Sequence, residues 1–276
     1  METIGGQALI GGILMRNKEK ISIAVRKNKK IILKREIIKF KESKKPFIRG
    51  IINLISTMHV GIKALNYSAS IQLNKKEKEN KFINIITIII AVIFALFLFK
   101  FLPLLLTQFI DDNLNLSSAS FNIIDGIIKL TILIMYIYII SRMKDIKRVF
   151  QYHGAEHKAV NCYESKKSLT IKNVKNFSTI HKRCGTTFIF LVIFISIIVY
   201  VFIPKDYSFS LKLLLRILLL PIIASISYEI LKFSAKYNNI ITRTITYPGL
   251  LIQKLTTNEP DNKQIEVAIK ALKGVI

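Results

Sequence analysis

Cysteine, histidine and acidic side chains are the scarce components of this 276-residue chain. Its two cysteines are too few for a disulfide scaffold, which excludes a small fold held together by disulfide bonds. Only 17 carboxylate side chains face 42 lysines and arginines, so the net charge is +25. Lysine supplies 33 of these cations, whereas a nucleic-acid groove favours arginine, whose guanidinium group binds phosphates and base edges bidentately. We therefore expect no nucleic-acid partner.

Apolar residues, by contrast, make up 51% of the chain, and the mean hydropathy is +0.40. Residues 1–14 do not combine a basic stretch with a sustained apolar core, so they do not predict a cleaved signal peptide. Four apolar stretches are long enough to cross about 30 Å of hydrocarbon. They are residues 82–102, 121–141, 186–204 and 211–231. The sequence thus predicts a mainly α-helical, four-span membrane bundle over residues 82–231.

The distribution of lysine and arginine predicts how this bundle is oriented. Nineteen of them precede the first span, none lies in residues 103–120, and 11 lie in the loop at 142–185. One lies in residues 205–210 and seven follow residue 231. Because basic loops stay on the cytoplasmic side, both termini and the 142–185 loop are predicted to be cytoplasmic. The short loop with Asp111 and Asp112 faces outward, and acidic lipid head groups are the expected partners of the basic side.

Residues 1–45 are predicted to form a small β-rich cytoplasmic cap. The β-branched stretches 21–26 and 31–38 flank the polar turn KNKK, which is typical of a hairpin or small sheet. The glycine pairs in GGQALIGG lack the GxGxxG spacing of a nucleotide-binding loop and are expected to serve turns or bulges.

Two further segments are predicted to lie outside the four spans. Residues 46–75 have apolar residues at helical spacing but no run long enough to span, which favours an amphipathic helix in the membrane interface or packed on the bundle. Residues 232–276 are predicted to be a cytoplasmic tail, interrupted at Pro248-Gly249 and ending in an amphipathic helix at 260–273.

The segment YHGAEHKAVNCYE, residues 152–164, gathers the scarce side chains. His153 and His157 are four residues apart, so on a helix their imidazoles lie on one face and can bind a single ion. Together with Glu156 they fit H-x-x-E-H, the inverted zinc-peptidase motif, in which the histidines bind metal and the glutamate activates water. The pattern predicts a site for a divalent metal, with zinc as the first candidate and Glu156 as the general base.

Further ligands are expected from two other places. The stretch HKRCGTTF supplies His181 and Cys184, and Glu229 lies near the cytoplasmic end of the fourth predicted span. Catalytic zinc keeps three protein ligands and one open position, whereas structural zinc fills all four. If both His181 and Cys184 bind, the site is closed and structural. If His181 or Glu229 alone completes it, the site is open and hydrolytic.

Other interpretations of these residues stay open at this point. The histidines can instead form a polar helix face that hydrogen-bonds to neighbouring loops. Lys182 and Arg183 precede a helix beginning near Gly185, where free backbone amides favour an anion such as a lipid or nucleotide phosphate. For Cys162 we expect a packing role in preference to ligation.

The same stretches carry a resemblance to a known family. YHGAEHKAVNCYE, HKRCGTTF, ISYEILKF and YPGLLIQKLTTNEPDNKQIEVAIKAL resemble the YqhQ-type bacterial membrane proteins, and so do GGQALIGGILMR and RGIINLISTMHVGIKALNYSA. The resemblance covers nearly the whole chain and implies a bacterial cell-membrane protein of a family labelled as predicted metal-dependent enzymes. It implies a polar signature at His153, Glu156, His157, His181, Arg183, Cys184, Tyr228 and Glu229. In its LTTNEPD motif we expect Glu259 and Asp261 to cap the final helix.

Three functions are compatible with these observations. The first is a membrane metal-dependent hydrolase with its site at the cytoplasmic face, acting on a membrane peptide or a lipid-linked phosphate ester. The second is a non-enzymatic membrane scaffold or partner-binding protein, in which a structural metal or hydrogen bonds hold the His/Cys cluster. The third, a transporter using Asp125, Lys129 and Arg216, is disfavoured because no inverted repeat is visible.

Overall fold

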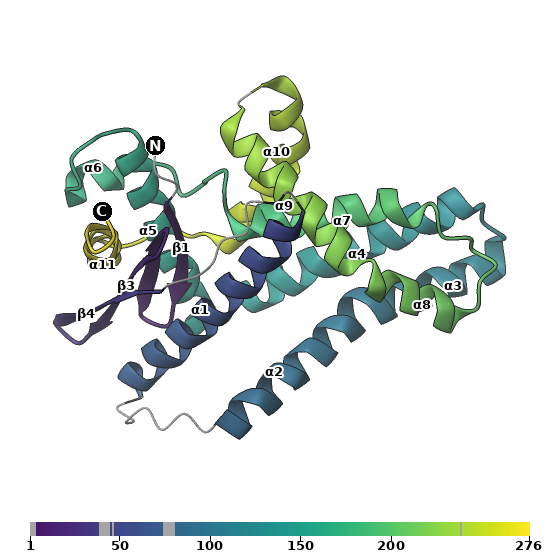
Figure 1. Ribbon diagram of the computed structural model, residues 1–276, viewed down its shortest axis with the longest axis horizontal. Helices are drawn as coiled ribbons and strands as arrows, with labels where there is room; N and C mark the ends of the chain where they lie inside the picture. Colours follow the sequence, from purple (N-terminus) through teal and green to yellow (C-terminus); the bar gives the residue numbers. More distant parts are fainter. Residues whose placement is uncertain (1–3, 39–44, 46, 74–80, 238) are drawn as a thin grey trace.

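The computed structural model describes residues 4–38, 45, 47–73, 81–237 and 239–276. Within these ranges the chain begins with a four-stranded antiparallel sheet and continues as helices (Figure 1). The strands have the same order in the chain and in the sheet: β1 (Ile4–Leu9), β2 (Gly12–Asn17), β3 (Lys20–Lys27) and β4 (Lys30–Ile37). The β3–β4 pair confirms the hairpin predicted around the KNKK turn.

Two-residue turns join the strands, and each turn contains a residue with positive φ. These are Gly11 (71°), Lys18 (54°) and Asn28 (54°). Positive φ in a two-residue loop matches the right-handed twist of the flanking strands, and glycine and asparagine adopt it at low cost. The register follows from these turns, with Leu9 paired to Gly12 and Lys27 paired to Lys30.

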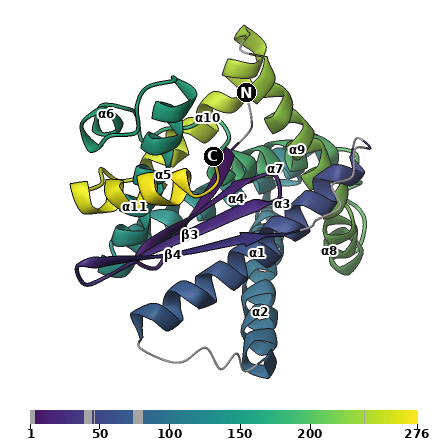
Figure 2. The ribbon, with the colours of Figure 1, turned by 60° about the vertical axis from the view of Figure 1, so that its left-hand side comes forward.

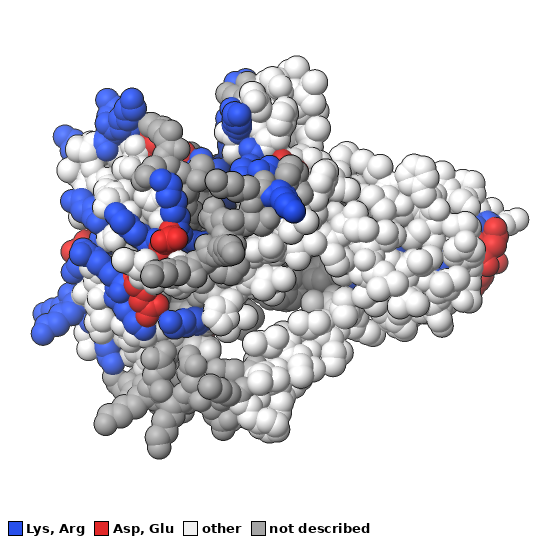
Figure 3. All heavy atoms as spheres, viewed as in Figure 1, with Lys and Arg blue, Asp and Glu red and all other residues white. Residues whose placement is uncertain are grey.

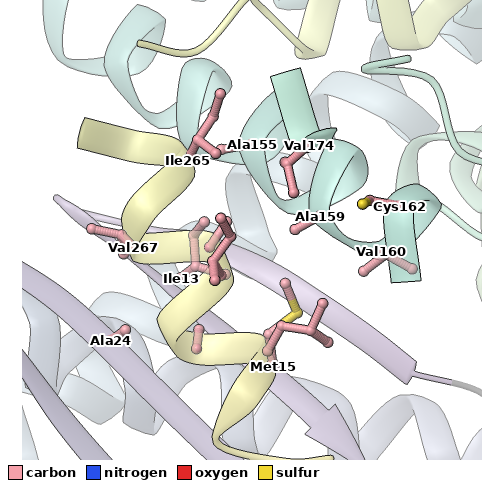
Figure 4. Close-up of a cluster of buried hydrophobic side chains, with 14 of the residues drawn as sticks. Ile13, Met15, Ala24, Ala155, Ala159, Val160, Cys162, Val174, Ile265 and Val267 are labelled. Atoms are coloured by element: carbon pink, nitrogen blue, oxygen red, sulfur yellow. The ribbon is translucent and has the colours of Figure 1, made fainter. Parts of the chain in front are cut away.

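Helices cover both faces of the sheet (Figure 2). One face packs on α5 (Lys144–Glu164) and α11 (Asn262–Lys273), and Met15 is fully buried there (Figure 4). The other face packs on α1 (Ile48–Gln72), which contributes the buried Val60. Burying a side chain of this size stabilises the fold by about 1.5–3 kcal/mol. The alternation of strand residues between these two cores therefore fixes the sheet between its helices.

The remaining helical elements form most of the molecule. They are α2 (Lys81–Leu96), the π-helical segment η1 (Phe97–Phe101), α3 (Leu102–Leu114), α4 (Ser118–Ser141), α6 (Ile171–Lys175), α7 (Gly185–Tyr200), α8 (Phe209–Leu218), α9 (Leu220–Lys236) and α10 (Ile240–Thr256). We call the sheet with α5, α6 and α11 the sheet unit. We call α2, η1, α3, α4, α7, α8 and α9 the helical arm; it extends away from the sheet unit in Figure 1.

The described residues contain two helices long and apolar enough to cross a membrane, at Ile85–Leu114 and Ser118–Ser141. A third candidate arises if α8 and α9 count as one span, although their axes bend by 42°. Helix α7 is apolar but has only 16 residues. The structure thus supports two or three candidate spans where the sequence predicted four.

The predicted span boundaries also change. The helix that begins the arm does not end at residue 102 but continues to Leu114, so the predicted outer loop with Asp111 lies in its last turn. The helix passes Pro103 because η1 precedes it: the Leu102 N–H donates to the Phe97 carbonyl five residues back, a wider turn than an α-helix makes. It ends at Asn115, which has a left-handed φ of 45°.

Prolines explain two more features of the helices. Pro221 lies in the first turn of α9, just after the break at Leu219 that bends the fourth predicted span. Pro248, predicted to interrupt the chain, lies inside α10, which continues to Thr256. The neighbouring Gly249 lies where α10 meets α7, because an added Cβ would be 3.0 Å from the Thr187 Cα. The Pro-Gly pair therefore allows close packing of two helices.

Charged side chains are unevenly distributed over the surface (Figure 3). Lysines and arginines gather over the sheet unit, whereas the visible face of the helical arm is almost entirely uncharged. Acidic side chains appear at the far tip of the arm, where Asp112 is exposed at the end of α3. The molecule thus has a basic end, an apolar middle and a small acidic tip.

Candidate metal centre

Most of the first half of the predicted 142–185 loop is the helix α5, and on it His153 and His157 lie on one face, as a spacing of four residues requires of a helix. The two imidazole rings meet edge to face, with centroids 4.4 Å apart. Ala155 and Ala159, which project from the other side of the helix, are fully buried in the core shared with the sheet. This packing fixes the rotation of α5 and so directs both histidines away from the sheet core.

Backbone carbonyls orient both rings through their Nδ1 atoms. His153 Nδ1 lies 2.9 Å from the Thr256 oxygen, and His157 Nδ1 lies 2.5 Å from the Thr179 oxygen. A carbonyl can only accept, so each Nδ1 carries the proton and each Nε2 keeps its lone pair. Metal-binding histidines are held in this way, with the second nitrogen hydrogen-bonded to a carbonyl or carboxylate.

Cys184 completes a group of three donor atoms. Its Sγ lies 3.2 Å from His153 Nε2, and the donor atoms of His153, His157 and Cys184 all lie within 4.8 Å of one another. Cys184 is the N-cap of α7 and accepts the Thr186 N–H at 3.4 Å. Free amides at a helix N-terminus favour negative charge, which suits a thiolate ligand. This group could hold a metal ion. The sequence predicted Cys184 as a ligand only together with His181, in a closed site, and not as the single third ligand.

Glu156 lies beside the three donors and is buried. Its Oε2 is 3.8 Å from His157 Nε2, and its side chain lies directly against Gly6 of β1. Burial raises the pKa of the Glu156 carboxyl, while the nearby His153 and Arg183 oppose this effect. The carboxylate is therefore placed close enough to the group to exchange a proton with a molecule bound there.

His181 lies near the group but is directed elsewhere. Its ring centroid is 5.6 Å from that of His157, and its Nε2 lies 3.3 Å from Glu164 Oε2. Arg183 pairs with the other oxygen of Glu164 and also donates to the Ile4 carbonyl at 3.5 Å. Burial acts to raise the pKa of Glu164, but the contacts with His181 and Arg183 outweigh it and lower that pKa. Glu164 thus holds both side chains at the edge of the site.

Glu229 does not join the three donors. The structure places it in a two-point ion pair with Arg49 of α1, at 2.8 Å from Arg49 Nε and 2.5 Å from Nη2. Its neighbour Tyr228 accepts a hydrogen bond from Asn53 at 2.9 Å. Lys182, predicted with Arg183 to bind an anion, is exposed. Tyr228 and Glu229, near the end of the predicted fourth span, therefore hold α9 against α1.

In the LTTNEPD motif, only one of the two predicted caps, Asp261 and not Glu259, caps the final helix. Asp261 caps α11, accepting the Gln264 N–H at 2.7 Å, as predicted. Glu259 does not cap the helix but pairs with Lys158 at 3.0 Å. The Cys162 thiol is buried in the core of the sheet unit, as expected for a packing residue, and burial raises its pKa.

Gly154 and the buried Gln253 help to position the residues of the site, although the sequence predicted no role for either of them. At Gly154 an added Cβ would lie 2.1 Å from the Asn258 oxygen, so only glycine lets the segment after α10 cross α5 this closely, while Thr256 at the end of α10 presents its carbonyl to His153. The fully buried Gln253 bonds both the N–H and the carbonyl of His181, at 3.0 and 2.9 Å. The one available signal was the glycine inside the H-x-x-E-H motif itself, an unfavourable residue in a helix.

The three donors and Glu156 open onto a cavity of about 550 Å³ between the sheet unit, α1 and the helical arm. Polar walls come from residues such as Gln7, Arg16 and Asn53, and apolar walls from Leu54 and Phe188. Catalytic zinc sites combine three protein ligands with one open position, and the three potential donors here have a cavity on one side.

Together, the fold and the site define a mainly helical protein with two or three helices suited to a membrane and a His/His/Cys group beside a small sheet. Residues 45–276 match the model of the family described as "Protein of unknown function (DUF1385)", and the chain belongs to that family. It is similar to "Uncharacterized protein YqhQ" of Bacillus subtilis (strain 168), with 34% identity over 297 residues that cover 99% of this chain and 92% of that protein. No solved structure matches. The resemblance drawn from the motifs is thus confirmed at the level of the family.

Proposed function

We propose that the chain is a metal-dependent hydrolase embedded in the bacterial cell membrane, with a divalent ion, zinc first, held by His153, His157 and Cys184. One observation carries this proposal: three donor atoms lie within 4.8 Å of one another while both histidine Nδ1 atoms are engaged by backbone carbonyls. Zinc accepts imidazole nitrogen and thiolate sulfur as ligands and leaves an open position when three side chains bind.

A divalent ion bound here would supply Lewis-acid chemistry, because such an ion can polarise a carbonyl or phosphoryl oxygen and favour ionisation of water. Glu156 faces the same cavity and would take the proton of the attacking water as general base. Arg16 and Arg183 line the cavity wall, which favours a lipid-linked phosphate ester over a membrane peptide as substrate.

The charge distribution supports the membrane placement. The helical arm is apolar and the sheet unit is basic, so both termini and the site are proposed to face the cytoplasm, close to acidic lipid head groups (Figure 3). The acidic tip with Asp112 would face outward. We propose no nucleic-acid partner, because lysine and not arginine supplies most of the basic residues of the chain.

Metal content of the purified protein tests the proposed ligands. We expect about one zinc per chain by elemental analysis, and loss of at least about 90% of it in His157→Ala and Cys184→Ser, since removing one of three ligands weakens binding severely. The chain offers matched controls: His59, exposed on α1, and Cys162, buried in the sheet unit. His59→Ala and Cys162→Ser should keep the metal. A metal-free wild type after reconstitution with zinc would refute the proposal.

Cobalt substitution separates the hydrolase from the scaffold. A cobalt-loaded site with one thiolate and an exchangeable position should change its visible spectrum when azide is added, whereas a closed structural site should not. Glu156→Gln should keep the metal and abolish cleavage of the chromogenic diester bis(4-nitrophenyl) phosphate. Equal loss of metal in this variant would remove Glu156 from the role of base.

A further inference from the structure

A second cluster of charge lies inside the helical arm, away from the metal centre. Lys100, Lys129 and Arg216 are all at most 7% exposed, and all three surround the ring of Tyr200. The distances from their charged groups to the ring centroid are 5.1, 4.7 and 5.0 Å. The Lys100 ammonium also donates to the Tyr200 hydroxyl at 2.8 Å. Three cations are therefore buried around one uncharged ring.

Only one carboxylate balances these cations in the part of the chain that the structure describes. Asp125 pairs with Lys129 through one oxygen and with Arg216 through the other, the latter at 2.5 Å. Arg216 also donates to the Asn122 amide oxygen at 2.8 Å, and its Nε has no hydrogen-bond partner. With all three cations charged, the cluster carries an excess of two positive charges in an apolar surrounding, where unbalanced charge is costly.

The acidic residues at the tip of the arm do not supply the missing charge. Asp111 lies 3.6 Å from Lys205 and accepts the Leu116 N–H at 2.8 Å, which holds it at the end of α3. The nearby Lys212 is also buried, but its ammonium is bonded to Gln108 and to the Lys205 carbonyl. An anion that neutralises the cluster must therefore come from outside these residues.

A groove leads to the cluster. Its volume is about 760 Å³, and Lys100 and Lys129 lie in its wall. Nearly all of the remaining wall is apolar, formed by α1, α2, η1, α4, α7 and α9, with residues such as Leu96, Leu133, Ile137 and Ile193. Each lysine ammonium has three N–H donors. Among the residues that the structure describes, Lys100 forms one hydrogen bond, to Tyr200, and Lys129 forms one, to Asp125. The groove is therefore lined by two lysines whose hydrogen-bonding capacity is partly unused among the described residues.

We propose that this groove binds a single-chain anionic amphiphile, with its carboxylate or phosphate against Lys100 and Lys129 and its hydrocarbon chain along the apolar wall. The acid group neutralises the excess charge, and the chain buries apolar surface that a small inorganic anion would leave bare. The proposal is independent of the metal centre, because neither lysine belongs to the group of His153, His157 and Cys184.

Displacement of the fluorescent acid cis-parinarate from the detergent-solubilised protein tests this site. Oleate and dodecyl phosphate should displace the probe, while oleyl alcohol should be at least about 10-fold weaker because it carries no charge, and inorganic phosphate should not compete. Lys100→Met removes one excess cation and keeps the side-chain length, so we expect at least about a 10-fold loss of oleate affinity. Lys212→Met is the matched control, a buried lysine outside the groove, and should bind oleate like the wild type.

Melting midpoints with and without oleate distinguish a loss of oleate binding from a loss of folding in the same variants. Since Lys100→Met relieves excess charge, its melting midpoint without ligand should equal or exceed that of the wild type. Oleate should raise the wild-type midpoint and leave that of Lys100→Met unchanged. Equal displacement by oleate and oleyl alcohol, competition by inorganic phosphate, wild-type oleate binding by Lys100→Met, or failure of that variant to fold would each overturn the proposal. None of these outcomes bears on zinc content, so the hydrolase proposal is judged separately.

Discussion

The contact between Gly6 and Glu156 gives the sharpest test of how the sheet shapes the site. A methyl group at Gly6 would lie 2.6 Å from Glu156 Oε1, 2.7 Å from Cγ and 2.8 Å from Cδ. Ordinary contacts are 3.4 Å or longer, so the side chain would have to move by about 0.6–0.8 Å. Glu156 is only 6% exposed and lines the cavity of about 550 Å³, so this movement would take the carboxylate out of its place beside the three donors. We expect Gly6→Ala to reduce stability by about 1–3 kcal/mol, the usual cost of overpacking.

The neighbouring Gly5 provides the control, because a Cβ there would meet nothing within 4 Å. Gly5→Ala should change stability by less than about 0.5 kcal/mol. In thermal melts of the detergent-solubilised protein, each kcal/mol corresponds to about 2–4 °C. A double-mutant cycle with Glu156→Ala isolates the contact: once the longer side chain is gone, Gly6→Ala should cost no more than Gly5→Ala.

Two results would refute this reasoning. Equal melting midpoints for Gly6→Ala and Gly5→Ala would mean that the sheet does not confine Glu156. A Gly6→Ala penalty that persists unchanged in the Glu156→Ala background would place its cause in the strand and not in the carboxylate. In either case the position of Glu156 beside the metal ligands would need another explanation.

Three further predictions follow from the same contacts. Gly154→Ala sets a Cβ 2.1 Å from the backbone oxygen of Asn258, so we expect a loss of about 3 kcal/mol or more in melting experiments and less zinc by elemental analysis. Asp125→Asn leaves two buried cations unpaired and should cost about 3–5 kcal/mol, whereas Asp112→Asn at the exposed tip should leave the melting midpoint unchanged. A chelator should lower the midpoint of the wild type but not that of His157→Ala, because only a site that binds metal loses stability on its removal.

Local sequence patterns were sufficient to predict part of the fold. The β-branched stretches around KNKK predicted the β3–β4 hairpin. The spacing of His153 and His157 predicted that they share a face if the segment is a helix, and the structure makes it one. The β1–β2 hairpin was harder to foresee, because Gly5 and Gly6 weaken the strand signal. Their use becomes clear only in three dimensions, where Gly6 makes room for Glu156.

Hydropathy alone predicted the helical arm less well. It measures how apolar a stretch is, but it does not show where a helix ends or bends. Pro103 follows a π-helical turn and does not stop its helix, whereas Pro221 lies at a break that bends α8 against α9. The apolar run at 186–204 forms a helix of only 16 residues. These boundaries depend on tertiary packing, so counting apolar runs gave four spans where the structure supports two or three.

Two of the predicted metal ligands, Glu229 and His181, pair with other side chains in the structure and do not join the group of three donors. Glu229 was considered because a carboxylate near membrane depth needs a partner, and it has one in Arg49 of α1. That arginine lies 180 positions away in the chain, so no spacing argument could find it. His181 likewise pairs with Glu164. Cys184 remains because its place at the start of α7 sets its sulfur beside His153.

The metal centre is assembled from segments that meet only after the whole chain has folded. Its histidines lie on α5, but the carbonyls that orient them belong to Thr179 and Thr256, and its sulfur belongs to Cys184 at the head of α7. The segment with Thr256 crosses α5 at Gly154 and then continues into α11, which packs on the sheet. Metal binding by this group would therefore be coupled to docking of the sheet unit against the helical arm. The candidate site thus lies at the junction of the basic sheet unit and the apolar helical arm (Figure 3).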